Sequence, residues 1–227
     1  MTPAQFLLAA RVPASLASQE FGPWKIERRK AVVGNLPDEI AFDMMVAGWD
    51  DYTILFRVSA RTLHLANQSE VVMEDSITEL RKHLPIWMVG RGRILVTGLG
   101  LGCVVRGLLA SDRIEHVDVI EIDPDVLRIV GAELNGNPRV TLHHADALTW
   151  EIPAGGKWDF AWHDIWTDGD TNLQILHAEL IKRFLPHTKN QGAWAFPRHV
   201  HRRLPFRAIG APRRGASLQH RTNEAAW

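Results

Sequence analysis

The fold of this chain is decided by residues 93–102, which read Arg-Ile-Leu-Val-Thr-Gly-Leu-Gly-Leu-Gly. The apolar half of this stretch predicts a buried β-strand, and the alternating glycines predict a tight turn directly after it. Because glycine has no Cβ atom and adopts positive φ readily, the main chain of such a turn can approach a ligand closely. A helix that begins after the turn presents free N–H groups at its start. The stretch therefore predicts a strand, a binding loop and a helix in succession.

The next apolar segment, residues 117–123, predicts a second strand and carries Glu121, 23 positions after Gly98. At about this interval, a nucleotide-binding βαβ unit places a carboxylate on the ribose hydroxyls. The third glycine of the dinucleotide fingerprint is missing, since Cys103 stands at its position. The pattern thus favours a nucleotide-like cofactor and disfavours nicotinamide dinucleotides.

Two later segments also deliver a carboxylate near the end of a strand. Residues 139–147 predict a strand that leads to Asp146, and residues 158–164 predict an aromatic strand that ends at Asp164. The carboxyl ends of parallel strands line the crevice in which doubly wound sheets bind ligands. We therefore expect an α/β fold with a Rossmann-like, doubly wound, mostly parallel sheet, in which Glu121 and these two aspartates meet at one edge.

The sequence divides into three parts. Residues 1–70 predict a small strand-rich N-terminal unit, residues 71–197 the Rossmann-like core, and residues 198–227 a basic, disordered tail without a periodic apolar face. Within these parts the patterns predict a short helix or disordered lead in 1–20, strands at 24–33, 41–47, 52–58 and 62–66, a helix from Glu70 to Leu84 that ends before Pro85, a helix at 171–185 and a strand at 192–196.

The composition is typical of a soluble globular fold, with 46% hydrophobic residues and equal numbers of acidic and basic residues. The single cysteine, Cys103, excludes an internal disulfide and fits a reducing compartment. The N-terminal residues have no basic leader, and no apolar run is long enough to span a bilayer. We therefore expect a cytoplasmic protein that does not bind membranes.

Histidines near the predicted crevice are expected to be structural rather than metal ligands. His143 and His144 are adjacent on a strand and therefore point to opposite faces of the sheet, so they are not expected to share one ion. His163, beside Asp164, is a minor candidate for proton transfer. We expect no bound metal.

Taken together, these motifs resemble those of the class I S-adenosylmethionine-dependent methyltransferases, and within them the branch that contains spermidine synthase. The resemblance covers residues 71–197. Besides the glycine loop, it rests on Glu-Ile-Asp-Pro at 121–124, Asn-Pro-Arg-Val at 137–140 before Asp146-Ala147, and Trp-Asp-Phe at 158–160 before Asp164.

The resemblance implies a role for each of these positions. Glu121 would hold the ribose hydroxyls of the cofactor, and Asp146 with Ala147 would bind its adenine. Asp164 would face the reacting centre as the catalytic residue. Three glycines would form the floor beneath the cofactor: Gly98, Gly100 and Gly102. In the loop after the aromatic strand, Trp166 and Asp168 would bind the acceptor.

Two positions depart from the spermidine synthase pattern. Those enzymes carry an aspartate between the last two glycines of the loop, where it helps to hold the aminopropyl amine of the donor, and this chain has Leu101 there. They also place a second aspartate three residues after the catalytic one, whereas Asp168 follows Asp164 by four. The expected core is also shortened, because the pattern stops where the family continues with another helix and two strands.

Three functions therefore remain open. The first is an S-adenosylmethionine-dependent methyltransferase that acts on a small-molecule acceptor, with amines and polyamines among the candidates and nucleic acid disfavoured. The second is an aminopropyltransferase that uses decarboxylated S-adenosylmethionine and a polyamine, which acidic residues such as Asp50, Asp51, Glu74 and Asp75 would attract. The third is a non-catalytic relative that serves as an interaction module, whose unfinished sheet edge docks a partner; a homodimer is one such arrangement.

Overall fold

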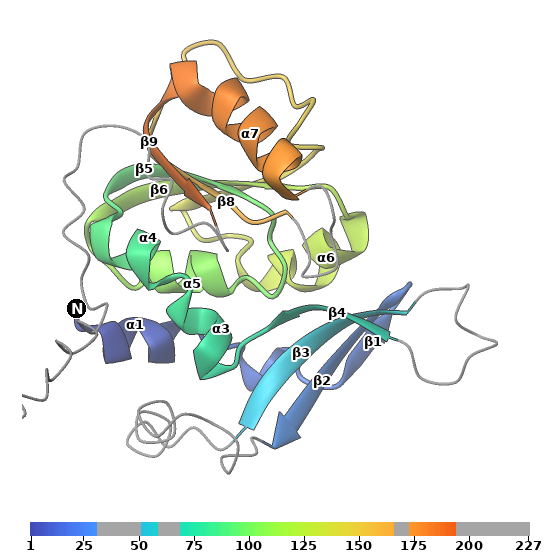
Figure 1. Cartoon of the computed structure of the whole chain (residues 1–227). Helices are drawn as coiled ribbons and strands as arrows, with labels where there is room; N and C mark the ends of the chain where they lie inside the picture. The colour runs from blue at the N-terminus through green and yellow to red at the C-terminus, as the bar shows by residue number, and fades with distance from the viewer. Residues whose placement is uncertain (31–50, 59–68, 166–172, 194–227) are drawn as a thin grey trace, which may run out of the picture.

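The computed structural model describes residues 1–30, 51–58, 69–165 and 173–193 (Figure 1), and the structural statements below concern these residues. They form two sheets. The first is antiparallel, with strand order β1-β2-β3-β4: β1 (Gln19–Phe21), β2 (Trp24–Lys30), β3 (Asp51–Val58) and β4 (Ser69–Glu74). The second is parallel, with strand order β7-β6-β5-β8-β9: β5 (Gly92–Thr97), β6 (Ile114–Glu121), β7 (Val140–His144), β8 (Trp158–His163) and β9 (Thr188–Ala193).

The parallel sheet confirms the predicted Rossmann-like α/β core. Its central strand, β5, pairs with β6 on one side and with β8 on the other, so the strand order reverses at β5. A crevice at the carboxyl ends of the strands is expected at such a reversal. The glycine loop follows β5 directly and therefore lies at this crevice.

Helices cover both faces of the parallel sheet. Figure 1 shows α7 (Leu173–Phe184) on one side, and α4 (Leu84–Val89), α5 (Cys103–Leu109) and α6 (Pro124–Ile129) on the other. On α7, Leu180 and Phe184 are fully buried whereas Ile175 is exposed, as the spacing of the apolar residues predicts. Short 3-10 turns complete the described elements: η1 (Ala14–Leu16), η4 (Gly131–Glu133) and η5 (Leu185–His187).

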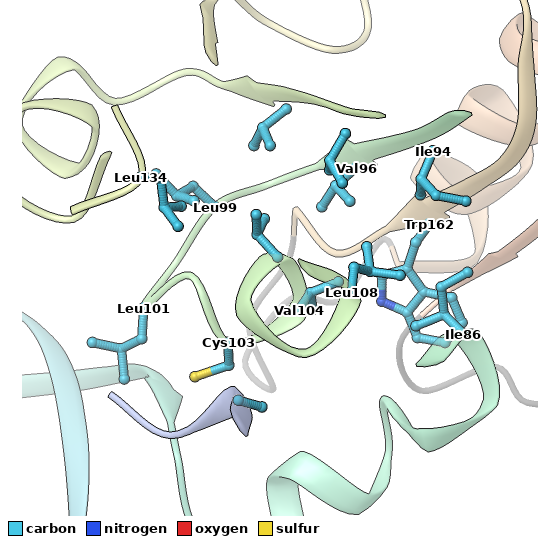
Figure 2. Close-up of a cluster of buried hydrophobic side chains, with 14 of the residues drawn as sticks. Ile86, Ile94, Val96, Leu99, Leu101, Cys103, Val104, Leu108, Leu134 and Trp162 are labelled. Atoms are coloured by element: carbon cyan, nitrogen blue, oxygen red, sulfur yellow. The ribbon is translucent and has the colours of Figure 1, made fainter. Parts of the chain in front are cut away.

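The core around β5 and α5 is apolar and includes the single cysteine. Figure 2 shows Cys103 among buried side chains such as Leu99, Val104 and Leu108. Burial raises the pKa of the Cys103 thiol to about 12, so the thiol is protonated near neutral pH. At the start of α5, Cys103 is therefore part of the packed core.

The N-terminal segment is folded onto the core rather than being a disordered lead. It begins with α1 (Pro3–Ala10), which Thr2 caps and which packs against α5. The buried carboxylate of Asp75, at the end of β4, accepts hydrogen bonds from the backbone N–H groups of Val12 and Thr53. Asp75 thereby ties this segment and β3 to one another.

The predicted helix from Glu70 to Leu84 is wrong in its first part. Residues 69–74 form β4, and two short helices follow: α3 (Ile77–Arg81) and then α4. The side chain of Ser76 accepts a hydrogen bond from the N–H of Glu79, which starts α3 after the strand. Pro85 lies in the first turn of α4, where its missing N–H costs no helical hydrogen bond, so it begins a helix rather than ending one. The expected boundary between the N-terminal unit and the core, after residue 70, falls inside β4.

The other expected elements have mixed outcomes. The strands predicted at 24–33 and 52–58 are confirmed as β2 and β3, whereas those at 41–47 and 62–66 lie outside the described residues. The last described strand is β9 (Thr188–Ala193), which begins before the predicted 192–196, and residues 194–196 lie outside the described residues. The tail beyond residue 193 lies outside the described residues. Within them, no helix is long and apolar enough to cross a membrane.

Candidate functional site

A pocket of about 470 Å³ lies at the carboxyl edge of the parallel sheet. Its volume falls in the range of small-molecule sites. The walls come from both sheets, because the antiparallel sheet lies over the loops that follow β5, β6, β7 and β8. From the parallel sheet, the lining residues include Gly98, Gly100, Glu121, Ile122, Asp123, Ala145, Asp146, Ala147, Asp164 and Ile165. From the antiparallel sheet, they are Trp24, Leu55, Arg57, Val72 and Met73.

The lining of this pocket is acidic. Among the described lining residues, Arg57 is the one basic side chain, against five carboxylates: Glu79, Glu121, Asp123, Asp146 and Asp164. Such a lining attracts a cationic ligand and repels an anionic one. A nucleoside that carries a positive charge fits these walls better than a pyrophosphate does.

The glycine loop is packed against the backbone of Asp164 and against the side chain of Met73 on β4. At Gly98, φ is +88° and a Cβ atom would lie 1.9 Å from the carbonyl oxygen of Asp164. At Gly100, φ is +50° and a Cβ atom would lie 2.5 Å from Sδ of Met73 on β4. Glycine is therefore required where the loop meets the end of β8 and where β4 crosses it.

Gly102 has a different place from the other two glycines. It adopts positive φ as the N-cap of α5 and is not among the residues that line the pocket. The preceding Leu101 is fully buried, and its backbone N–H points to Sδ of Met73 at 3.1 Å. The pocket therefore gains no polar side chain at the position where spermidine synthases have an aspartate.

Glu121 ends β6 at the base of the pocket and is 8% exposed. One carboxylate oxygen accepts a hydrogen bond from the N–H of Leu99 at 2.7 Å, and the other accepts one from the N–H of Asp123 at 2.9 Å. Burial raises the pKa of Glu121, although both donors oppose this effect. Glu121 thus joins the glycine loop to the end of β6, and each oxygen has a further lone pair for a ligand.

Asp146 both begins a helical turn and lines the pocket. Its side chain accepts a hydrogen bond from the N–H of Leu148 at 2.8 Å, and its carbonyl accepts one from the N–H of Trp150 at 2.7 Å, as at the start of a helical turn. Asp146 also lines the pocket, together with the buried Ala147.

Asp164 lies directly after β8, where its N–H donates to the carbonyl of Thr97 at 2.9 Å. Its side chain lines the pocket and is 16% exposed. Burial and the negative charge of Glu79 raise the pKa of Asp164 well above its usual value, the charge of Glu121 adds to this effect, and Lys82 opposes it. The carboxyl group therefore holds a proton more firmly than an exposed aspartate.

His83 lies behind Asp164 and was not predicted from the sequence. The imidazole is fully buried, and within the described residues neither ring nitrogen has a hydrogen-bond partner. Its Nε2 lies 3.9 Å from Oδ2 of Asp164, and its ring contacts the indoles of Trp87 and Trp162. Its position in the sequence was a signal for burial. His83 lies three positions after Leu80 and four before Trp87, so at helical spacing it falls on the same face as these apolar residues.

The other histidines near the pocket have structural partners. His163 is fully buried between Thr97 and Gln191, at 3.1 and 2.9 Å, and burial lowers its pKa to about 4. With both ring nitrogens hydrogen-bonded, His163 is not available for proton transfer to a ligand. His143 contacts Asp118 and His144 contacts the carbonyl of Ile122, so the two imidazoles have separate environments, as expected.

The remaining predicted positions either lie outside the described residues or are used within the fold. Trp166 and Asp168 lie outside the described residues. Asp51 forms ion pairs with Arg11 and Arg28, and Asp75 accepts backbone N–H groups in the interior. The expectation that these acidic residues attract a polycation is wrong for Asp75, which is fully buried. Glu74 accepts a hydrogen bond from the Ser76 hydroxyl, and Asp50 lies outside the described residues.

A buried carboxylate outside the pocket, Asp118 on β6, gives a testable pH dependence. Burial alone would raise its pKa, but hydrogen bonds from His143, Trp158 and Arg93 outweigh that effect and lower the pKa from 3.8 to about 2. A carboxylate with a depressed pKa stabilises the fold above its unfolded pKa, and this contribution disappears as the pH falls toward the folded pKa.

We therefore expect the parent protein to lose about 2 kcal/mol of its free energy of unfolding through Asp118 as the pH falls from about 4 to about 2. Asp118→Asn removes this titration, so its stability falls less steeply over the same range. Urea unfolding at several pH values measures both slopes, with the exposed Asp112→Asn as the control. Parallel curves for the parent and Asp118→Asn would contradict the assignment.

The fold and the pocket define a class of protein. A parallel Rossmann-like sheet with a glycine loop after its central strand and carboxylates after three strands resembles the class I S-adenosylmethionine-dependent methyltransferases and spermidine synthase. No protein-family model matches the sequence.

Two curated proteins illustrate the similarity. Polyamine aminopropyltransferase 2 of Ralstonia nicotianae is 29% identical over 105 residues, which cover 42% of this chain and 21% of that protein. Ribosomal RNA small subunit methyltransferase A of Pseudomonas syringae pv. tomato is 35% identical over 60 residues, 26% of this chain and 22% of that protein. The chain spans about a fifth of the length of the curated relatives that it matches.

Among solved structures, spermidine synthase from Thermotoga maritima aligns with a TM-score of 0.43 and 14% identity, over 63% of this chain and 52% of that one. A dimethyladenosine transferase from Plasmodium falciparum aligns with a TM-score of 0.40 and 20% identity, over 52% and 40% of the two chains.

Proposed function

We propose that this chain binds S-adenosylmethionine in the pocket and transfers its methyl group to a small-molecule acceptor. One observation carries the proposal: Glu121, Asp146 and Asp164, each from a different strand end, line one cavity with the glycine loop. A nucleoside with a ribose, an adenine and a reacting group needs a polar partner at three separated points, and this cavity has one after each of three strands.

The described residues fit this cofactor. An added Cβ at Gly100 would extend toward Met73 at the pocket wall, so the glycine keeps room that a side chain would take. The acidic lining suits a ligand with a positive charge. Glu121 would hold the ribose hydroxyls, Asp146 with Ala147 the adenine, and Gly98 with Gly100 the underside of the cofactor. Gly102 would support the loop from the start of α5.

When bound, the cofactor supplies a methyl group that its positive sulfur already activates. The protein then needs to orient the acceptor, exclude water and receive one proton. Asp164 is the proposed proton acceptor, because it lines the pocket at the end of β8. Trp166 and Asp168 are proposed to bind the acceptor. An acidic pocket also disfavours nucleic acid as the acceptor, and a cytoplasmic location stays a prediction.

An aminopropyltransferase that uses decarboxylated S-adenosylmethionine is the second candidate. The names of the Ralstonia nicotianae relatives favour it, and so does the acidic lining, since that donor carries an additional free amine. The buried Leu101 weighs against it, because no carboxylate stands where spermidine synthases hold this amine. A non-catalytic interaction module is the third candidate.

Calorimetric titration with both donors separates these candidates. The proposal expects S-adenosylmethionine to bind more tightly than its decarboxylated form, and NAD to bind weakly or not at all. Tighter binding of the decarboxylated donor would favour aminopropyl transfer instead. A folded protein that binds neither donor would contradict both enzymatic candidates and favour the interaction module.

Glu121→Ala is expected to weaken the binding of S-adenosylmethionine by about 1–3 kcal/mol, the range for hydrogen bonds to a charged group. The variant also frees the N–H groups of Leu99 and Asp123, so Glu121→Gln is a second comparison: it removes the charge and keeps one of the two acceptor oxygens. Titration calorimetry measures both affinities, and Glu115→Ala, an exposed position on the same strand, is the control. Unchanged affinity in Glu121→Ala would exclude Glu121 as the ribose ligand.

A further inference from the structure

His83 and Asp164 form a pair at the wall of the pocket. Asp164 faces the cavity, whereas His83 is fully buried, with Nε2 3.9 Å from Oδ2 of Asp164. Within the described residues, neither nitrogen of His83 has a hydrogen-bond partner, and its ring is otherwise packed against Trp87 and Trp162. Buried polar groups are nearly always hydrogen-bonded, so an unpartnered imidazole beside a pocket carboxyl group calls for a functional explanation.

We infer that His83 and Asp164 share one proton, which rests on Asp164 in the ligand-free protein and moves to Nε2 of His83 when a positive charge is held beside the carboxyl group. His83 is thus a positioning residue, which acts through Asp164. The inference rests on the proposed function, because the positive charge is that of S-adenosylmethionine.

The ligand-free pair is neutral for a physical reason. Charged groups are costly in an apolar interior, and burial lowers the pKa of His83 to about 3 while it raises that of Asp164. Among the residues that the structure describes, the other charged groups that act on the pair are Glu79 and Lys82, whose charged atoms lie 2.6 Å apart, and Glu121 on β6. Glu79 and Glu121 disfavour the Asp164 carboxylate, whereas Lys82 favours it and disfavours a charged His83.

A cation in the pocket changes this balance, because it is closer to Asp164, which lines the cavity, than to His83 behind it. Its attraction for the carboxylate then exceeds its repulsion of the imidazolium. The O–H bond of Asp164 breaks and an N–H bond forms at Nε2, so the net charge of the pair stays the same. The 3.9 Å separation must shorten for this transfer, as contacts in ligand-free sites commonly do on binding.

The pair then provides a base only when the cofactor is bound. The Asp164 carboxylate takes the proton that the acceptor loses, and His83 afterwards releases its extra proton to solvent. One proton therefore leaves for each methyl group transferred, and the pair returns to its neutral form. Without cofactor, Asp164 stays protonated.

Nitrogen-15 NMR of histidine-labelled protein tests this inference near neutral pH. Spectra are recorded without ligand, with S-adenosylmethionine, and with S-adenosylhomocysteine, which has the same nucleoside but no sulfonium charge. The His83→Gln variant identifies the signals of His83, and Asp164→Asn tests the partner. We expect a doubly protonated His83 ring with S-adenosylmethionine in the parent, and a neutral ring with S-adenosylhomocysteine or in Asp164→Asn.

Calorimetry in buffers of different ionisation enthalpy gives a second readout, the number of protons released on binding. In the parent, the two ligands should release equal numbers, because the proton of Asp164 stays within the pair. In His83→Gln, this proton must leave, so S-adenosylmethionine should release up to about one more proton than S-adenosylhomocysteine. His187→Gln on η5, outside the pocket, is the matched control and should behave as the parent.

The outcomes separate the inference from the proposed function. If both ligands bind and the His83 ring is neutral in both complexes, the inference is wrong while the proposed cofactor site stands. If neither ligand binds the folded parent, the proposed function fails and the inference fails with it. The NMR test remains possible even if His83→Gln does not fold. In the complexes with S-adenosylmethionine, the ring signals that differ between the parent and Asp164→Asn then identify His83.

Discussion

Gly100→Val is expected to abolish measurable binding of S-adenosylmethionine while most of the fold remains. The added Cβ would lie 2.5 Å from Sδ of Met73, so the flexible Met73 side chain must move or the loop must shift at the pocket wall. In addition, the backbone at φ +50° is left-handed, which costs a branched residue about 1–2 kcal/mol. Titration calorimetry measures the loss of binding, and circular dichroism verifies the fold.

The control for this prediction is Gly136→Val. Gly136 also has a left-handed backbone, at φ +87°, but a Cβ atom there would meet nothing within 4 Å, and the residue does not line the pocket. It should lower stability through the same backbone strain and leave cofactor affinity unchanged. A folded Gly100→Val variant that binds as tightly as the parent would exclude this turn as part of the cofactor site.

The parallel core could be predicted because its signals are local. Residues 94–96 are continuously apolar, which is typical of a strand buried on both faces, and Thr97 leads directly into the glycines. Glu121 and Asp164 could be placed at one edge because the carboxyl ends of parallel strands meet there. Their convergence in one pocket follows from topology alone.

The errors occur where tertiary contacts outweigh local pattern. Met73, Ile77 and Leu80 have helical spacing, yet the first lies in β4 and the others in α3. The strand forms because it pairs with β3, and Asp75 and Ser76 then redirect the chain. No window of sequence contains that pairing, so periodicity alone favoured a single helix.

The last strand shows the same limit. Residues 188–191 are polar, and nothing in their pattern predicts a strand. Gln191 is nevertheless buried, because its side chain pairs with His163 on β8 and donates to the carbonyl of Ile181 on α7.

The role inferred for His83 could not be predicted from the sequence either. It depends on the distance between His83 and Asp164, which are 81 positions apart in the chain.

Asp164→Asn is expected to lower turnover by about 10²–10⁴-fold, the range for a positioned acid–base group, and to leave cofactor affinity nearly unchanged. Asparagine keeps the size of the side chain, but it cannot accept the proton that the acceptor loses.

The measurement needs an acceptor, so it follows a screen of amines, polyamines and small hydroxylated compounds with labelled S-adenosylmethionine. Asp146→Asn is the informative comparison, because its proposed contact is with the adenine and its loss should weaken binding more than it slows transfer. Unchanged turnover in Asp164→Asn would remove this residue from the mechanism. A parent that binds the cofactor and transfers nothing to any acceptor would favour the non-catalytic relative, since the pocket would then serve binding alone.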